Sequence, residues 1–281
     1  MSLPTVSVCM VVRDDLPFLK RLMKMSASYA DEFVIIDNGS KDGTWEFLQE
    51  QVELAKVHPE DGPKIVIEQA GPEIIPELGF SYLKNRAAQL ATCDWIHSLD
   101  ADEVLDPKQQ NLLKPFLKYC KADVLSIITR TFEKSKPKSM ARGYGALDMA
   151  TEERYHADWP WWIAEDYQYE DMSHRRIYRR NANLEWRGYI HEELYQGETN
   201  AAAICQNSEF RHWHFTNFRW WQTDDRLKRA RYSWMLLNAY RHPGLQVHTN
   251  RWWYGVYVPQ HLKDIEHWAG LYEEMKKEGK V

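Results

Sequence analysis

Two carboxylates lie at the end of a short apolar segment near the middle of the chain. Trp95, Ile96 and Leu99 supply the apolar side chains, and Asp100 and Asp102 come directly after them. In an extended strand these two aspartates project to the same side, so their oxygens can face one cation. Oxygen ligands of this kind suit Mg²⁺ or Mn²⁺. On the residues alone, a helix cap is the alternative, because Asp is common at helix N-termini.

A series of apolar segments predicts the sheet that would position these carboxylates. The segments have the near-continuous, β-branched pattern of strands buried on both faces. They are residues 6–12, 33–36, 64–68, 95–99 and 124–130. Helical patterns separate several of them, which predicts βαβ units. Ligands of open α/β sheets bind beyond the carboxyl ends of the strands, so Arg13, Asp37 and Asp100 are expected to meet in one crevice.

Glycine-rich phosphate loops are absent from the sequence. No G-x-G-x-x-G follows any of these strands, and there is no G-x-x-x-x-G-K-[ST]. Dinucleotide-binding and P-loop proteins cradle phosphate with such glycines. If the substrate carries phosphate, the sequence therefore predicts that a metal ion holds it.

Composition narrows the class of protein. The net charge of -5 argues against general nucleic-acid binding, so an anionic substrate needs a local cationic site or a metal. The 4 cysteines are far apart and form no C-x-x-C pair, which indicates neither a zinc site nor a disulfide framework. No apolar run approaches the ~20 residues that span a bilayer, and the N-terminus lacks a signal-peptide pattern. A soluble, cytoplasmic protein without a transmembrane segment is expected.

No repeat or clear linker interrupts the chain, which favours one compact domain with a helical extension. We expect the domain to cover residues 1–220, with a donor-nucleotide half at 1–130 and an acceptor or lid half at 131–220. An aromatic-rich stretch at 133–170 is interpreted as an excursion over the crevice. A C-terminal helical appendage is expected at 221–281.

The order of motifs adds a family resemblance. Arg13-Asp14-Asp15 closes the first strand, DNGSKDGT follows the second, LKNRAAQLA lies on a helix, DWIHSLDADE holds the Asp pair, and GYIHE comes later. Together they resemble the inverting family 2 nucleotide-sugar glycosyltransferases. That resemblance implies the GT-A fold, an α/β fold with a mostly parallel central sheet and flanking helices. One departure is Arg13, where such transferases often carry Asn.

The resemblance implies roles for donor-binding residues. Asp37 matches the acidic residue that binds the nucleotide base, and Arg86 matches a basic residue near the base and the diphosphate. Asp100 would contact the ribose or the metal. The full set of implied donor contacts is Arg13, Asp37, Asn38, Arg86, Asp100, Ala101 and His191.

The resemblance also implies a metal site. Asp102 would bind a divalent cation, Mn²⁺ or Mg²⁺, that bridges the diphosphate oxygens, and Asp100 would assist. A late histidine often completes this site in the fold. His214 is the first choice, because it lies nearer the helix that follows, and His212 is the runner-up. The competing interpretation is a pair of packed or exposed histidines on a strand.

An inverting transfer needs a general base that takes the proton of the acceptor hydroxyl. Glu192 is the candidate, because it lies in the His-Glu segment where the family tends to place its base. Asp166 is the runner-up. The competing interpretation of Glu192 is a solvated surface carboxylate.

The resulting prediction is a metal-dependent glycosyltransferase of the hexosyltransferase type. It would move a sugar from a UDP- or GDP-sugar to a saccharide or other hydroxyl acceptor with inversion. Two alternatives stay open. A haloacid-dehalogenase-like phosphatase would use Asp100 as its nucleophile, and a non-catalytic protein would only bind a nucleotide or sugar. The sugar, the nucleotide, the acceptor and the oligomeric state cannot be read from the sequence.

Overall fold

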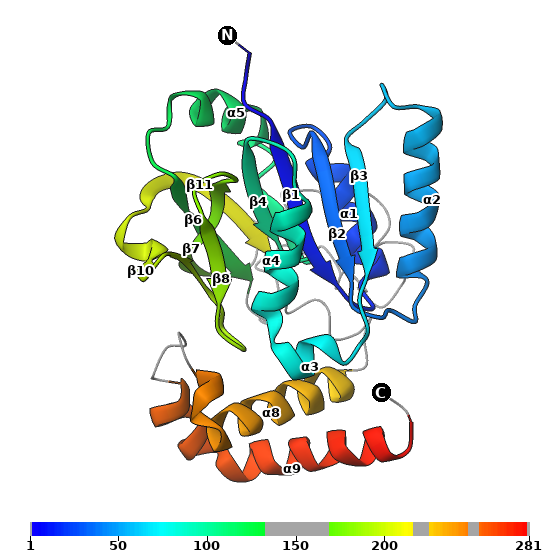
Figure 1. The fold of residues 1–281 in the computed structure, drawn as a ribbon, viewed down its shortest axis with the longest axis vertical. Coiled ribbons are helices and arrows are strands. Elements are labelled where there is room, and N and C mark those ends of the chain that lie inside the picture. The colour runs from blue at the N-terminus through cyan, green and yellow to red at the C-terminus, as the bar shows by residue number, and fades with distance from the viewer. Residues whose placement is uncertain (1, 133–168, 216–224, 247–252, 280–281) are drawn as a thin grey trace, which may run out of the picture.

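The computed structural model describes residues 2–132, 169–215, 225–246 and 253–279. The predicted α/β class is confirmed, since a large mixed sheet lies at the centre with helices around it (Figure 1). The strand order in this sheet is β3-β2-β1-β4-β7-β6-β11-β5. The predicted excursion at 133–170 and its aromatic residues fall almost entirely outside the described residues.

The N-terminal part has the predicted alternation of strands and helices. Its elements are β1 (Val6–Val12), α1 (Leu16–Ser26), β2 (Glu32–Asp37), α2 (Thr44–Val57) and β3 (Lys64–Gln69). The three strands are parallel, with Val12 opposite Asp37 and Asp37 opposite Gln69. Parallel strands buried on both faces need continuous apolar side chains, and every residue of β2 is buried. The carboxyl ends of these strands consequently lie at one edge of the sheet.

The middle of the chain extends the sheet and makes it mixed. It contains α3 (Ile74–Leu78), α4 (Phe80–Leu90), β4 (Trp95–Leu99), β5 (Glu103–Leu105), α5 (Gln110–Tyr119), β6 (Val124–Phe132) and β7 (Tyr169–Arg179). β4 runs parallel to β1, whereas β7 is antiparallel to both β4 and β6. β11 (Gln206–His214) runs parallel to β6 and antiparallel to β5. The register places His214 opposite both Glu103 and Thr131, which brings it close to the Asp pair.

A small antiparallel sheet follows β7. Its strands are β8 (Leu184–Arg187), β9 (Glu193–Gln196) and β10 (Thr199–Asn200). The loop from β8 to β9 carries the GYIHE motif. The register pairs Arg187 with Glu193, so this loop leaves and rejoins the small sheet at neighbouring positions.

Two long helices complete the chain, α8 (Asp225–Arg241) and α9 (Val258–Lys277). They pack side by side below the edge of the sheet in Figure 1, next to α3. Met235 and Ala239 of α8 and Ile265 of α9 belong to the same buried cluster as Ala87 of α4 and Tyr189 of the β8–β9 loop. The expected C-terminal helices are therefore present, and they share a core with the sheet domain. Among the described helices none has the length and apolar character required to cross a bilayer.

Candidate active site

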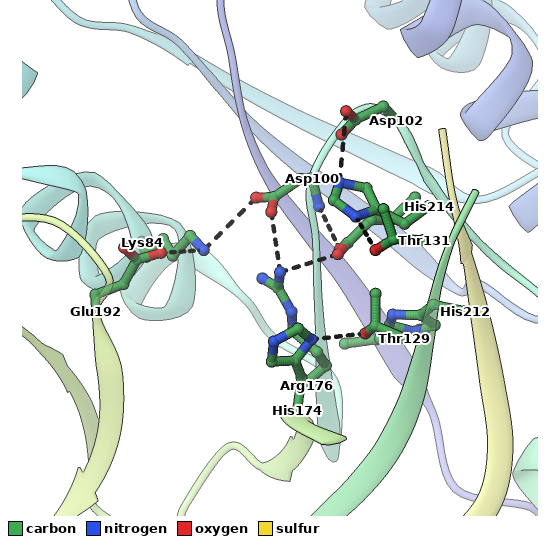
Figure 2. Close-up of polar contacts among 12 residues, drawn as sticks. Lys84, Asp100, Asp102, Thr129, Thr131, His174, Arg176, Glu192, His212 and His214 are labelled. Atoms are coloured by element: carbon green, nitrogen blue, oxygen red, sulfur yellow. Dashed lines mark hydrogen bonds and ion pairs between the residues drawn. The ribbon is translucent and has the colours of Figure 1, made fainter. Parts of the chain in front are cut away.

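A cavity of about 790 Å³ opens beyond the carboxyl ends of β1 and β4. Its walls come from the ends of β1, β4, β7 and β11, from the β8–β9 loop, and from α4 and α8. The residues in it that matter for chemistry are Arg13, Lys84, Asp100, Ala101, Asp102, His174, Arg176, His191, Glu192, His214, Arg231 and Tyr232. Figure 2 shows the polar contacts among several of them. The crevice expected at this edge of the sheet is thus present.

Asp100 follows β4 and is held by two cations. Arg176 of β7 donates a hydrogen bond of 2.9 Å to its Oδ2, and the Lys84 ammonium lies 3.5 Å from its Oδ1. Arg176 also donates to the buried carboxylate of Glu103, at 3.0 Å. Burial alone would raise the pKa of Asp100, but the charges of Lys84 and Arg176 hold it well below its usual range. Asp100 is therefore ionised, and its negative charge is balanced by the positive charges of Lys84 and Arg176 (Figure 2).

Asp102 has a different neighbour. Its side chain is 1% exposed, and its Oδ2 lies 3.6 Å from Nε2 of His214. Nδ1 of His214 contacts the Thr131 hydroxyl at 3.0 Å, which fixes the ring (Figure 2). Burial lowers the pKa of His214, but the Asp102 carboxylate outweighs that effect and raises it. The two side chains face each other at the edge of the cavity.

The chemistry of these two side chains fits a hard divalent cation. A carboxylate oxygen is a ligand that both Mn²⁺ and Mg²⁺ accept, and the added imidazole nitrogen favours Mn²⁺, a transition metal, over Mg²⁺. Among the described residues, His58, Glu60 and Asp61 form the group of three candidate ligands whose ligand atoms lie within 4.8 Å of one another, and all three are exposed; Asp100, Asp102 and His214 do not form such a group. Exposed acidic groups are common without a metal, so that surface cluster is given no function here.

Glu192 lies in the β8–β9 loop with its side chain 13% exposed, so it is not a solvated surface group. Its carboxylate forms an ion pair with Lys84, the same cation that reaches Asp100 (Figure 2). The Lys84 ammonium lies 4.9 Å from the centre of the Trp186 ring. Burial lowers the pKa of Lys84, but the charges of Asp100 and Glu192 outweigh burial and raise the pKa above its usual value, so Lys84 is protonated. One buried lysine thus links the Asp pair to Glu192.

The sequence of this site and its scaffold match a known family. A model of glycosyl transferase family 2 matches residues 7–219. The chain belongs to glycosyl transferase family 2. This match covers the sheet, the β8–β9 loop and the cavity-lining residues other than Arg231 and Tyr232 of α8, and it supports a glycosyl transfer function.

Single relatives and solved structures match the chain to different extents. A TPR repeat-containing protein of Synechococcus elongatus is 33% identical over 104 residues, which are 37% of this chain and 22% of that protein. The chain therefore spans about a fifth of the length of this curated relative. TarS 1–349 of S. aureus has a TM-score of 0.45 at 13% identity, covering 83% of this chain and 66% of its own. Mannosyltransferase PcManGT from Pyrobaculum calidifontis, solved with GDP-Man and Mn²⁺, has a TM-score of 0.36 at 20% identity, covering 45% of this chain and 36% of its own.

The phosphatase alternative is not supported in this glycosyltransferase. The family match places the Asp pair within a glycosyl transferase sequence. Moreover, β4 is not the first strand of the sheet, and three neighbouring strands precede it in the chain.

The placement of Arg86 differs from the expectation. Its guanidinium forms hydrogen bonds of 2.6 to 3.1 Å with Glu68 on β3, and its side chain is 41% exposed. It does not line the cavity. Residues two apart on a helix lie about 200° apart around the axis, so Lys84 and Arg86 point in opposite directions. Lys84 is the cation that enters the cavity. In the sequence, its helical spacing from Phe80, Leu83 and Ala87 places it on the packed face of α4, and this spacing could have identified it as the inward-facing cation.

His212, the runner-up metal ligand, lies in the core. It is 0% exposed and its Nε2 lies 2.6 Å from Nε2 of His97, whose Nδ1 contacts the Tyr29 hydroxyl at 3.0 Å. Burial, followed by the charge of His97, lowers its pKa well below the usual value. His212 and His214 are on the same side of β11, but His212 lies one repeat, about 7 Å, deeper in the sheet. It is therefore not at the cavity, whereas His214 is.

Asp37 and Asn38 lie at the end of β2 and do not line the cavity, so Asp37 does not meet Arg13 and Asp100 there as expected. Asp37 is buried and its Oδ1 accepts a hydrogen bond of 2.8 Å from the Ser40 amide. Its Oδ2 and the Asn38 Oδ1 have no hydrogen-bond partner among the described residues. Burial raises the pKa of Asp37. Their role toward the nucleotide base stays a prediction.

The remaining candidates divide by location. Arg13, Ala101 and His191 line the cavity as expected, whereas Asp166 lies outside the described residues. Arg231 and Tyr232 line it too, and both come from α8, where no sequence motif pointed to the site. Burial and the nearby Arg13 lower the pKa of Arg231 to about 10. Helix α8 thus forms part of the cavity wall.

Proposed function

We propose that this family 2 enzyme is a metal-dependent, inverting transferase that moves a sugar from a nucleotide-sugar, a UDP- or GDP-sugar, to a hydroxyl acceptor. One observation carries the proposal. Asp102 and His214 lie on one side of a single cavity, and Glu192 faces the same cavity from the β8–β9 loop. A metal site and a base on separate elements are what this reaction needs.

In this proposal Asp102 and His214 hold Mn²⁺ or Mg²⁺, and Asp100 takes a supporting role. A bound divalent cation would offset the charge that develops on the departing nucleoside diphosphate. Lys84 and Arg176 already neutralise Asp100, so they hold that carboxylate in a fixed direction. The protonated Lys84 is also close enough to the metal site to attract the diphosphate oxygens.

Glu192 acts as the general base. Its carboxylate takes the proton of the acceptor hydroxyl while that oxygen forms a bond to the anomeric carbon. The bond from this carbon to the diphosphate oxygen breaks on the opposite face, and the nucleoside diphosphate leaves with the electron pair. The Lys84 ion pair holds the Glu192 carboxylate inside the cavity. Phe80 and Trp186 give the cavity apolar surface against which the C–H faces of a sugar can pack.

The test is an assay with defined donors. The protein is incubated with Mn²⁺ and a panel of UDP- and GDP-sugars, and release of nucleoside diphosphate is measured, with water or simple sugars as acceptors. We expect release from at least one donor, loss of release on chelation, and inversion at the anomeric carbon by NMR. Release that persists in excess chelator would contradict metal dependence, and a product with retained configuration would contradict Glu192 as the base of an inverting transfer.

A further inference from the structure

The loop that carries Glu192 is anchored on one side by the start of α4. The Phe80 amide donates a hydrogen bond of 3.0 Å to the Tyr189 carbonyl, and the Tyr189 hydroxyl donates to the Pro76 carbonyl. Gly79 has a φ of 85°, and a Cβ there would lie 2.6 Å from the Tyr189 oxygen. Only glycine permits this approach. The first half of the loop is therefore fixed to α3 and to the start of α4.

The other side of the loop is held by α8. The Tyr232 hydroxyl lies 2.6 Å from Nε2 of His191, and the two rings meet edge to face with centres 5.8 Å apart. The Tyr232 hydroxyl can donate to Nε2 or accept from it, depending on the ring tautomer, and either arrangement joins the loop to α8. Burial lowers the pKa of His191 to about 4, which is consistent with a neutral ring.

His191 has an unusual backbone conformation. Its φ is 56°, in the left-handed region that residues other than glycine, asparagine and aspartate seldom adopt. Such strain persists only where the surroundings impose it, and it gathers at functional sites. The residue immediately after this strained position is Glu192. The backbone conformation at 191 therefore sets the direction in which the Glu192 side chain leaves the loop.

We propose that Tyr232 is a positioning residue for Glu192. By binding the imidazole of His191 it holds the strained conformation at position 191, and so it directs the Glu192 carboxylate toward Lys84 and the cavity. This inference rests on the proposed role of Glu192 as the base. It makes α8, which the sequence suggested was part of an appendage, a working part of the active site.

The test compares Tyr232→Phe, the matched control Tyr254→Phe and His191→Asn, together with the double variant of Tyr232→Phe and His191→Asn. Tyr232→Phe removes only the hydroxyl, and we expect it to lower kcat for nucleoside-diphosphate release about tenfold, the scale of one lost hydrogen bond, without changing donor KM. Tyr254→Phe is the control, because Tyr254 is also buried beside α8 and its hydroxyl has no hydrogen-bond partner among the described residues. It should leave kcat unchanged. The donor used is the nucleotide sugar of the panel from which nucleoside diphosphate is released fastest.

The third variant, His191→Asn, distinguishes positioning from general stability. Asparagine tolerates the left-handed conformation but cannot reach Tyr232. If Tyr232 acts through His191, the double variant should be no slower than His191→Asn alone. A wild-type kcat for Tyr232→Phe, or losses that multiply fully in the double variant, would overturn the positioning role. Glu192→Gln, measured in parallel, separates the positioning role of Tyr232 from the base role of Glu192. A slow Glu192→Gln with a normal Tyr232→Phe overturns positioning alone, whereas a normal Glu192→Gln overturns the base assignment together with it.

Discussion

Asp100 and Asp102 are two residues apart, yet their surroundings differ. Asp100 is 37% exposed and is held by Lys84 and Arg176, whereas Asp102 is 1% exposed and faces His214. The first carboxylate is neutralised by protein cations that also reach Glu103 and Glu192. The second faces His214, which we propose binds the metal together with it. In this proposal the two halves of the Asp-x-Asp motif have separate tasks, one connected to the base and one to the metal.

The largest effect is expected on the Asp100 side, at Glu192. Glu192→Gln keeps the shape and removes the basicity, so kcat should fall by about 10² to 10⁴ while donor affinity is nearly unchanged. Steady-state kinetics and calorimetry with the nucleoside diphosphate measure the two quantities. Glu193→Gln is a neighbouring control, because Glu193 is bound by Asn200 at 2.6 Å. A Glu192→Gln variant that weakens donor binding and leaves kcat intact would assign this residue to the donor.

A second prediction concerns stability. Arg176→Met leaves the fully buried Glu103 without its cation, and breaking such a pair should lower the free energy of unfolding by about 3 kcal/mol. Asp102→Asn should cost much less, since its partner His214 can become neutral. Chemical denaturation of both variants at pH 7 makes the comparison. Equal losses in the two would mean that both aspartate environments are structural, and the proposed division would then fail.

The third prediction concerns two cations on one helix. Lys84→Gln should weaken binding of the nucleoside diphosphate about tenfold, because a buried charge near the metal site is lost. Arg86→Gln removes a charge two residues away on the opposite face of α4, where it pairs with Glu68, and should have little effect. Calorimetric titrations give both affinities. If Arg86→Gln proves the more damaging change, the nucleotide binds on the other side of α4 from Asp100.

Local sequence patterns were sufficient for the strands and for the Asp pair, because a buried parallel strand needs a continuous apolar segment and its end fixes the carboxylates. Glu192 and His214, which the motifs singled out, line the cavity, and their roles stay predictions. Arg86 does not line the cavity, whereas Lys84, on the other face of α4, does. The strand pattern places the side chains of His212 and His214 on the same side of β11, so it cannot distinguish them. They differ in how far along the strand, and so how deep in the sheet, each one lies. Tyr232 and Arg231 reach the cavity through the packing of α8, which no local pattern encodes.

In the proposed site Asp102 is the main metal ligand and Asp100 only supports it. This division is tested most directly by calorimetric titration of UDP and GDP into the protein with and without Mn²⁺, for Asp102→Asn and Asp100→Asn. We predict that Asp102→Asn abolishes the Mn²⁺-dependent part of the affinity, whereas Asp100→Asn retains a substantial share of it, because Asp100 is already neutralised by Lys84 and Arg176. Full Mn²⁺-dependent affinity in Asp102→Asn, or its complete loss in Asp100→Asn alone, would contradict the account.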